Sequence, residues 1–194
     1  MPSMNEPRET WDRITGDGEA QSKALVLLKR QGVTFQTFLK CGSPAVAQGV
    51  TNKNYWEINN NAAPLIVLPV YDGPVPSIYW PVDDPVLCDL VAWRQNDPHN
   101  WHFLVGDYPA FLGQFWADDA AFVHDNITLY STPLDWLRGD GSGSVVLDWD
   151  LARPDFLQMG GIVTENMSLG ERALSCLRQP EPNLPEVSVL MGAS

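Results

Sequence analysis

Acidic residues that follow two short apolar runs near the C-terminus could bind a metal ion. Asp148 and Asp150 come directly after the run 145–147, and Glu165 ends a second β-type run. Carboxylates at the carboxyl end of a buried strand are common in metal- and phosphate-handling sites, and such oxygen ligands suit Mg²⁺. One hypothesis is therefore a small metal-dependent enzyme, or a binder of a phosphate-containing ligand, that uses Asp148, Asp150 and Glu165.

The same carboxylates also have a purely structural interpretation. Asp148 and Asp150 suit the end of a strand and the cap of a following helix. The glycine-rich segment 138–144 precedes the strand instead of following it, so it does not match a phosphate-binding loop. The sequence also has no nucleophile elbow and no dinucleotide fingerprint. We therefore favour a protein without catalysis or cofactor, with Mg²⁺ as the one cofactor hypothesis kept open.

Tryptophan and acidic residues occur close together in the middle of the sequence. Eight tryptophans occur among 194 residues, and 24 acidic residues outnumber 12 basic ones. Tryptophan is enriched at binding hot spots, and acidic surfaces attract basic ones. The leading hypothesis is a non-enzymatic protein-interaction module that contacts a basic partner protein. Its candidate interaction residues are Trp80, Asp83, Asp84, Trp93 and Trp101.

The acidic excess begins after residue 53. The remaining residues, 54–194, hold 19 of the 24 acidic residues and five of the 12 basic ones. Because this charge repels phosphate, we expect no direct binding to nucleic acid or to an anionic membrane. The alternative interpretation is that the acids form a solvated face and that most tryptophans pack in the core.

Cysteine usage and hydropathy indicate a cytoplasmic protein. Cys41, Cys88 and Cys176 lie far apart and match no zinc or redox spacing, which is typical of reduced thiols. The N-terminal residues lack the apolar stretch of a secretory signal. The longest apolar run, 65–70, is too short to cross a bilayer.

The pattern of apolar and turn residues predicts an α+β fold. We expect an N-terminal helix, a central antiparallel region of short strands, and a C-terminal half in which strands and helices alternate. Residues 1–18 are predicted to be a flexible arm, and 19–194 a single globular domain. Within that domain, 54–106 is the β-rich part and 107–194 the mixed α/β part.

Individual elements follow from the same pattern. The clearest helix covers 19–31 and is followed by a predicted strand over 33–40 and a loop over 41–63. Asp-Gly and Asp-Pro turns divide a predicted meander with strands over 65–71, 77–80, 87–94 and 101–105. Later helices are predicted over 108–116, 133–138 and 168–178, a helical turn over 154–158, and strands over 127–130, 145–149 and 162–164.

Three stretches between residues 86 and 170 carry a resemblance to known proteins. They read DLVAWRQNDPHNW, TPLDWLRGDGSGSVVLDWD and GGIVTENMSLG. They resemble uncharacterised proteins encoded in prophages and other mobile elements of proteobacteria. The resemblance implies an accessory protein of phage or mobile-element type, and it implies no activity, cofactor or functional residue.

Overall fold

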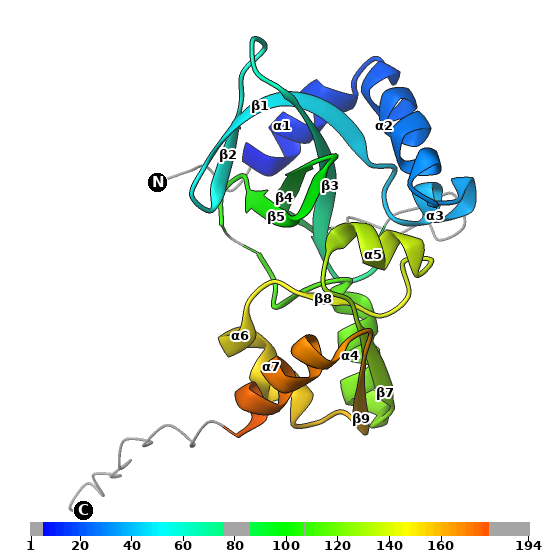
Figure 1. The fold of residues 1–194 in the computed structure, drawn as a ribbon, viewed down its shortest axis with the longest axis vertical. Coiled ribbons are helices and arrows are strands. Elements are labelled where there is room, and N and C mark those ends of the chain that lie inside the picture. The colour runs from blue at the N-terminus through cyan, green and yellow to red at the C-terminus, as the bar shows by residue number, and fades with distance from the viewer. Residues whose placement is uncertain (1–5, 76–85, 107, 179–194) are drawn as a thin grey trace, which may run out of the picture.

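The fold combines an N-terminal group of helices, a small β-barrel and a C-terminal part in which helices and strands alternate. The computed structural model describes residues 6–75, 86–106 and 108–178. Within these ranges the chain forms seven helices and nine strands. The barrel and its helices occupy the upper part of Figure 1, and the C-terminal part lies below them. This arrangement confirms the predicted α+β class with a helix at the N-terminus.

Three helices open the described chain: α1 (Glu6–Thr15), α2 (Glu19–Arg30) and α3 (Phe35–Lys40). The prediction of helix α2 is confirmed. The predicted loose arm is wrong for residues 6–15, because Trp11 of α1 is 7% exposed and packs into the hydrophobic cluster of the barrel. Burial of so large an aromatic surface holds this segment against the strands.

The predicted strand over 33–40 is also wrong, because local capping outweighs the β-type composition. The Thr34 side chain accepts a hydrogen bond from the backbone N–H of Thr37 at 3.0 Å and so caps α3. A threonine N-cap satisfies one of the free amides at the start of a helix. The buried Phe38 then anchors α3 in the core.

Five strands close the barrel in the order β1-β2-β5-β4-β3. They are β1 (Ala45–Asn52), β2 (Tyr55–Ile58), β3 (Pro64–Asp72), β4 (Val86–Arg94) and β5 (Asp97–Phe103). The antiparallel pairing of β3, β4 and β5 confirms the predicted central antiparallel region. The predicted meander is wrong in detail, because β3 pairs directly with β4 and β5 begins at Asp97, within a predicted Asp-Pro turn. The predicted loop over 41–63 is wrong, since β1 and β2 form a hairpin there. Gly49 permits this pairing, because a Cβ on it would lie 2.9 Å from the Glu57 carbonyl oxygen.

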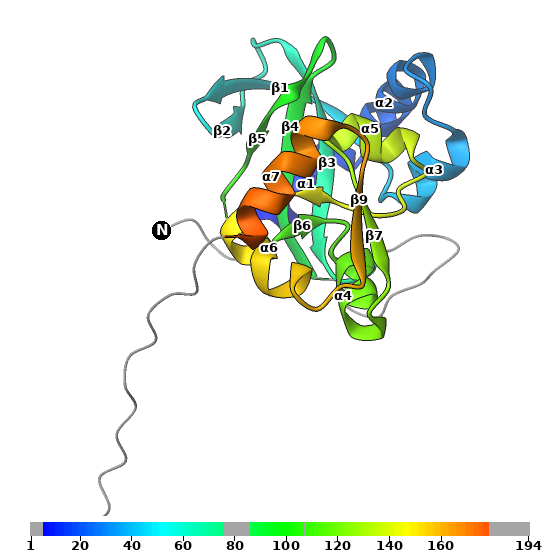
Figure 2. The same cartoon turned by 60° about the horizontal axis from the view of Figure 1, so that its bottom comes forward.

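The C-terminal part holds two small sheets and four helices. The sheets pair β6 (Phe111–Leu112) with β8 (Val145–Val146) in antiparallel and β7 (Asn126–Leu129) with β9 (Gly161–Thr164) in parallel. The β7–β9 pair runs beside the C-terminal helices in Figure 2. The helices are α4 (Gln114–Val123), α5 (Pro133–Arg138), α6 (Trp149–Phe156) and α7 (Met167–Leu177).

Two predictions in this part need correction. The predicted helix over 108–116 contains strand β6, and α4 begins only after Gly113, which adopts a φ of 81°. The predicted strand over 145–149 ends at Val146, because Asp148 caps helix α6. The predictions for β7, β9, α5 and α7 are confirmed to within two residues. The predicted strand over 77–80 lies outside the described residues.

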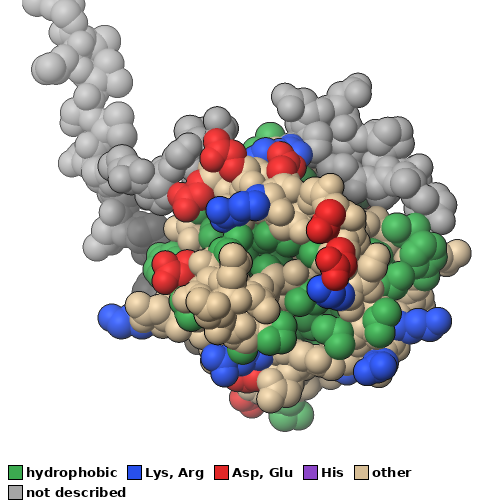
Figure 3. Space-filling view, turned by 90° about the horizontal axis from the view of Figure 1, so that it is seen from above, with side chains coloured by type: hydrophobic (Ala, Val, Ile, Leu, Met, Phe, Trp, Pro, Cys, Tyr) green, Lys and Arg blue, Asp and Glu red, His purple; other side chains and the backbone are tan. Residues whose placement is uncertain are grey.

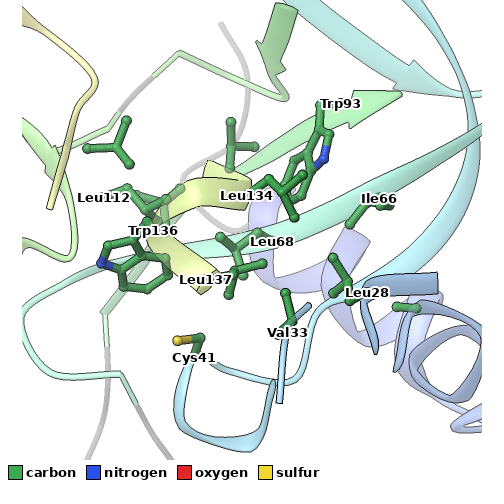
Figure 4. Packing of buried hydrophobic residues seen from close by; sticks show 14 of the residues in the cluster. Leu28, Val33, Cys41, Ile66, Leu68, Trp93, Leu112, Leu134, Trp136 and Leu137 are labelled. Carbon is green, nitrogen blue, oxygen red and sulfur yellow. The ribbon is translucent and has the colours of Figure 1, made fainter. Parts of the chain in front are cut away.

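One buried cluster joins the two parts of the fold. It brings together Leu28 and Cys41 from the N-terminal segment, Trp93 from the barrel, and Leu112 and Trp136 from the C-terminal part. Figure 4 shows these side chains converging from strands and helices far apart in the sequence. Since each part supplies side chains to the other's core, the barrel and the C-terminal part pack as neighbours. None of the described helices is long and apolar enough to span a membrane.

Candidate functional site

A pocket of about 400 Å³ opens where helix α3 meets the C-terminal part. Helices α3 and α5 contact each other there, at the lower right of the barrel in Figure 1. Concave sites of this size with apolar walls and a few polar groups are typical of ligand-binding sites. The lining residues are Gln36, Lys40, Cys41, Gly73, Pro74, Val75, Gly113, Phe115, Trp116, Trp136, Asp140 and Gly141.

Two tryptophans form part of the pocket wall. Both are hydrogen-bonded to the glycine-rich loop that follows α5, residues 139–144. The indole Nε1 of Trp116 donates a hydrogen bond to the carbonyl oxygen of Gly141 at 2.9 Å. The indole Nε1 of Trp136 donates to the carbonyl oxygen of Gly143 at 2.8 Å. Because both indole N–H groups are satisfied inside the protein, each ring is held in place and its remaining surface is apolar.

The glycines of this loop are required by its path. Gly141 and Gly143 have φ angles of 64° and 76°, a region that side chains disfavour. A Cβ on Gly143 would collide with the carbonyl oxygen of Thr128, and a Cβ on Gly141 would collide with the sulfur of Cys41. The loop therefore approaches strand β7 and helix α3 more closely than other residue types would allow.

Asp140 ties the loop to helix α3 at the pocket rim. Its carboxylate accepts a hydrogen bond from Thr37 Oγ1 at 2.6 Å and pairs with Lys40 Nζ at 3.0 Å. The hydrogen bond from Thr37, and then the charge and hydrogen bond of Lys40, lower the pKa of Asp140 below its ordinary value. Within the described lining of the pocket, these two charged groups thus neutralise each other.

The thiol of Cys41 belongs to the apolar wall. Burial raises the pKa of the Cys41 thiol to about 12, and the nearby Lys40 only partly opposes this effect. A thiol with such a pKa is uncharged at neutral pH, and the thiolate is the reactive form of cysteine. Cys41 therefore contributes packing to the pocket and no nucleophile.

Outside the pocket, one carboxylate is fully buried. Asp89 of β4 accepts hydrogen bonds from the backbone N–H groups of Leu104, Val105 and Gly106 at 3.0, 3.1 and 2.7 Å, and from that of Leu90 at 2.6 Å. Burial raises its pKa, while these four N–H groups act in the opposite direction. Because every contact is to backbone, Asp89 has a structural role and fixes the segment that follows β5.

Two of the three carboxylates of the metal hypothesis, those of Asp148 and Glu165, accept hydrogen bonds from nearby backbone N–H groups. Asp148 accepts hydrogen bonds from the N–H groups of Asp150 and Leu151 at 2.8 and 3.0 Å and so caps α6. Glu165 accepts a hydrogen bond from the N–H of Ser131 at 2.6 Å. Over the described ranges, no three His, Cys, Asp or Glu side chains form a group that could hold a metal ion. The structure therefore does not assemble Asp148, Asp150 and Glu165 into a metal centre.

The candidate interaction residues differ in their exposure and in whether the structure describes them. Trp93 has no exposed surface and lies in the core, so its side chain cannot contact a partner. Trp101 is half-buried and packs against the same core. Trp80, Asp83 and Asp84 lie outside the described residues. In the part of the chain that the structure describes, Trp116 and Trp136 line the pocket, and neither is among the candidate interaction residues.

The exposed acidic residues of the region 54–194 are dispersed over several of the described elements. Glu57 lies on β2 and Asp97 on β5, whereas Asp118 and Asp119 lie on α4, at the other end of the molecule (Figure 1). The face seen from above in Figure 3 carries acidic and basic side chains side by side, with hydrophobic ones between them. The charge of this part of the protein is therefore distributed over several surfaces.

Searches of protein-family models, curated proteins and solved structures found no match to this chain.

Proposed function

We propose that this protein is a non-enzymatic interaction module whose recognition point is the pocket between α3 and the glycine-rich loop. The observation that carries the proposal is the double anchoring of Trp116 and Trp136 to the carbonyl oxygens of Gly141 and Gly143. These bonds form the pocket in advance of any ligand and leave its wall apolar. A preformed apolar cavity binds without the cost of ordering its own side chains.

The polar groups of the pocket favour binding over catalysis. General acid–base or nucleophilic catalysis requires a group whose protonation state suits proton or electron-pair donation. The Cys41 thiol stays protonated because burial raises its pKa. Asp140 and Lys40 are paired with each other at 3.0 Å. Both observations support a site that holds a group and does not transform it, and such a function needs no cofactor.

The charge of the chain supports a partner that carries basic residues. A formal net charge of −12 accelerates the approach of a basic protein and slows that of nucleic acid. The long-range attraction would bring the partner in, and the pocket would provide the short-range specificity. A cytoplasmic accessory role of the phage or mobile-element type fits the resemblance of residues 86–170 to prophage proteins.

The test is selection of peptides from a random displayed library on the folded protein, followed by comparison of two matched variants. Gln36 and Gln48 are both exposed, but only Gln36 lines the pocket. We expect selected peptides to lose binding to Gln36→Trp, which fills the mouth of the pocket, and to keep it with Gln48→Trp. We also expect binding to weaken as salt increases. Failure to select any peptide, or equal binding to Gln36→Trp, would overturn the proposal.

A further inference from the structure

We infer that the pocket recognises an uncharged aromatic side chain of a partner protein together with the peptide amides beside it. The inference rests on the proposed function and names the group that the pocket accepts. Three features of the cavity carry it: the aromatic walls, the neutralised charges and the polar groups at the rim.

The walls favour an aromatic ring. Phe115 and Trp116 both line the pocket and are half-buried, and their rings meet edge to face with centroids 5.4 Å apart and an interplanar angle of 69°. Aromatic rings prefer edge-to-face and offset contacts with one another, and these contacts stabilise a pair beyond the burial of its area. A third ring placed against the Trp116 side of this pair gains that interaction, which an aliphatic side chain of similar size does not.

The charges favour an uncharged ring. Among the described residues that line the pocket, Lys40 and Asp140 are the charged ones, and they pair with each other. A cationic ligand would have to displace Lys40 from Asp140, and an anionic ligand would have to displace Asp140 from Lys40. Since a charged group also loses its hydration on entering an apolar cavity, either ligand binds more weakly than a neutral one.

The rim favours a ring that is carried by a peptide. Gln36 is exposed at the pocket, and its side-chain amide offers both donors and an acceptor to a peptide group. Lys40 Nζ contacts the Asp140 carboxylate and carbonyl oxygens at 3.0 and 3.2 Å, which leaves its third hydrogen free to donate. The cavity, at about 400 Å³, also has room for more than one ring.

Small neutral and charged probes test the inference on the full chain. The probes are indole, N-acetyl-tryptophanamide, N-acetyl-leucinamide, tryptamine and indole-3-acetate. The indole N–H signals of Trp116 and Trp136, followed by nuclear magnetic resonance, report binding at the pocket itself. We expect N-acetyl-tryptophanamide to bind roughly 3- to 10-fold more tightly than N-acetyl-leucinamide, and more tightly than both charged probes.

The rim is tested with a matched pair of alanine variants. Gln36→Ala should weaken the binding of N-acetyl-tryptophanamide and leave that of indole unchanged, because indole has no peptide group. Gln48→Ala, at an exposed position away from the pocket, should change neither. Indole binding as tight as N-acetyl-tryptophanamide binding would show that a free ring suffices and would overturn the peptide part of the inference.

The outcomes separate this inference from the proposed function. Equal binding of N-acetyl-leucinamide and N-acetyl-tryptophanamide would refute aromatic recognition, while peptides whose binding needs an open pocket would still support the interaction module. Tighter binding of tryptamine or indole-3-acetate would likewise refute the preference for an uncharged ring. If the selected peptides bind Gln36→Trp as tightly as wild type, the proposed function is refuted, and this inference with it.

Discussion

The sulfur of Cys41 occupies the space into which a side chain on Gly141 would project. The two residues are far apart in the sequence, and they meet where the end of α3 contacts the glycine-rich loop. Both line the pocket. The same loop residue accepts the hydrogen bond of the Trp116 indole. The fit between a buried thiol and a glycine therefore sets the distance between two walls of the cavity.

Replacing Gly141 by alanine should destabilise the protein by about 1–3 kcal/mol or more, because a left-handed φ and a collision with Cys41 act together. Urea unfolding measures the change. In the double variant Cys41→Ala/Gly141→Ala the collision is removed, so part of the loss should be recovered while the backbone strain remains. If the free-energy losses of the two single variants simply add up in the double variant, the contact between Cys41 and Gly141 is not the cause.

The Lys40–Asp140 ion pair at the pocket rim should make the stability of the protein depend on pH. The hydrogen bond from Thr37 and the charge of Lys40 lower the pKa of Asp140 in the folded protein. A carboxyl group with a lowered pKa stabilises the fold above its unfolded pKa, and this contribution disappears as the pH falls through the folded pKa. Wild type should therefore exceed Asp140→Asn in stability at pH 7, and the difference should shrink toward pH 3.

The magnitude of this effect is limited by exposure. The Asp140 side chain is 61% exposed, so solvent screens the pair and we expect a difference below about 1 kcal/mol. Urea unfolding at both pH values provides the measurement, with Asp97→Asn on the exposed start of β5 as the control. A difference that stays constant between pH 7 and pH 3 would contradict the assigned role.

The cysteines should differ in reactivity in the folded protein. Cys41 is buried and its thiol has a pKa of about 12, whereas Cys88 is only partly buried. Alkylation with iodoacetamide at pH 8, followed by peptide mass spectrometry, should label Cys88 first and leave Cys41 largely unmodified. Addition of denaturant should make all three cysteines reactive. Labelling of native Cys41 at the rate of Cys88 would show that the pocket wall opens readily.

The role of Asp148 separates the structural interpretation from the metal hypothesis. Asparagine caps helices about as well as aspartate, but alanine does not. We therefore expect Asp148→Ala to lose about 1 kcal/mol of stability and Asp148→Asn to lose much less, since both amide contacts of the cap can be kept. Millimolar Mg²⁺ should leave the melting temperature of wild type unchanged. A rise that Asp148→Asn abolishes would instead restore the metal hypothesis.

Elements with strong periodicity could be predicted from the sequence, and those decided by one local contact could not. The apolar stripe of α2 and the long apolar runs of β3 and β4 led to correct predictions. Strand β1 was missed because its alanines, glycine and polar residues have low β-propensity, and the closure of the barrel decides its conformation. Helix α3 was missed because the Thr34 cap outweighed its β-type residues.

The pocket could not have been located from sequence patterns. Its walls come from segments around residues 36–41, 73–75, 113–116 and 136–141, which only the tertiary fold brings together. The one local signal was the glycine-rich segment 138–144 close to Trp136. Its function is to supply backbone carbonyl oxygens to two indoles, and bonds to backbone atoms leave no pattern in side-chain types.

The parallel pairing of β7 with β9 has a consequence for the order of folding. The two strands are joined through α5, β8 and α6, so they can pair only after a long intervening stretch has been made. The hairpin of β1 and β2 closes over a short turn and can form early in synthesis. The α3 side of the pocket thus leaves the ribosome well before Trp136 and Gly141. The walls of the pocket therefore cannot all be present in a nascent chain before Gly141 and Gly143 have emerged.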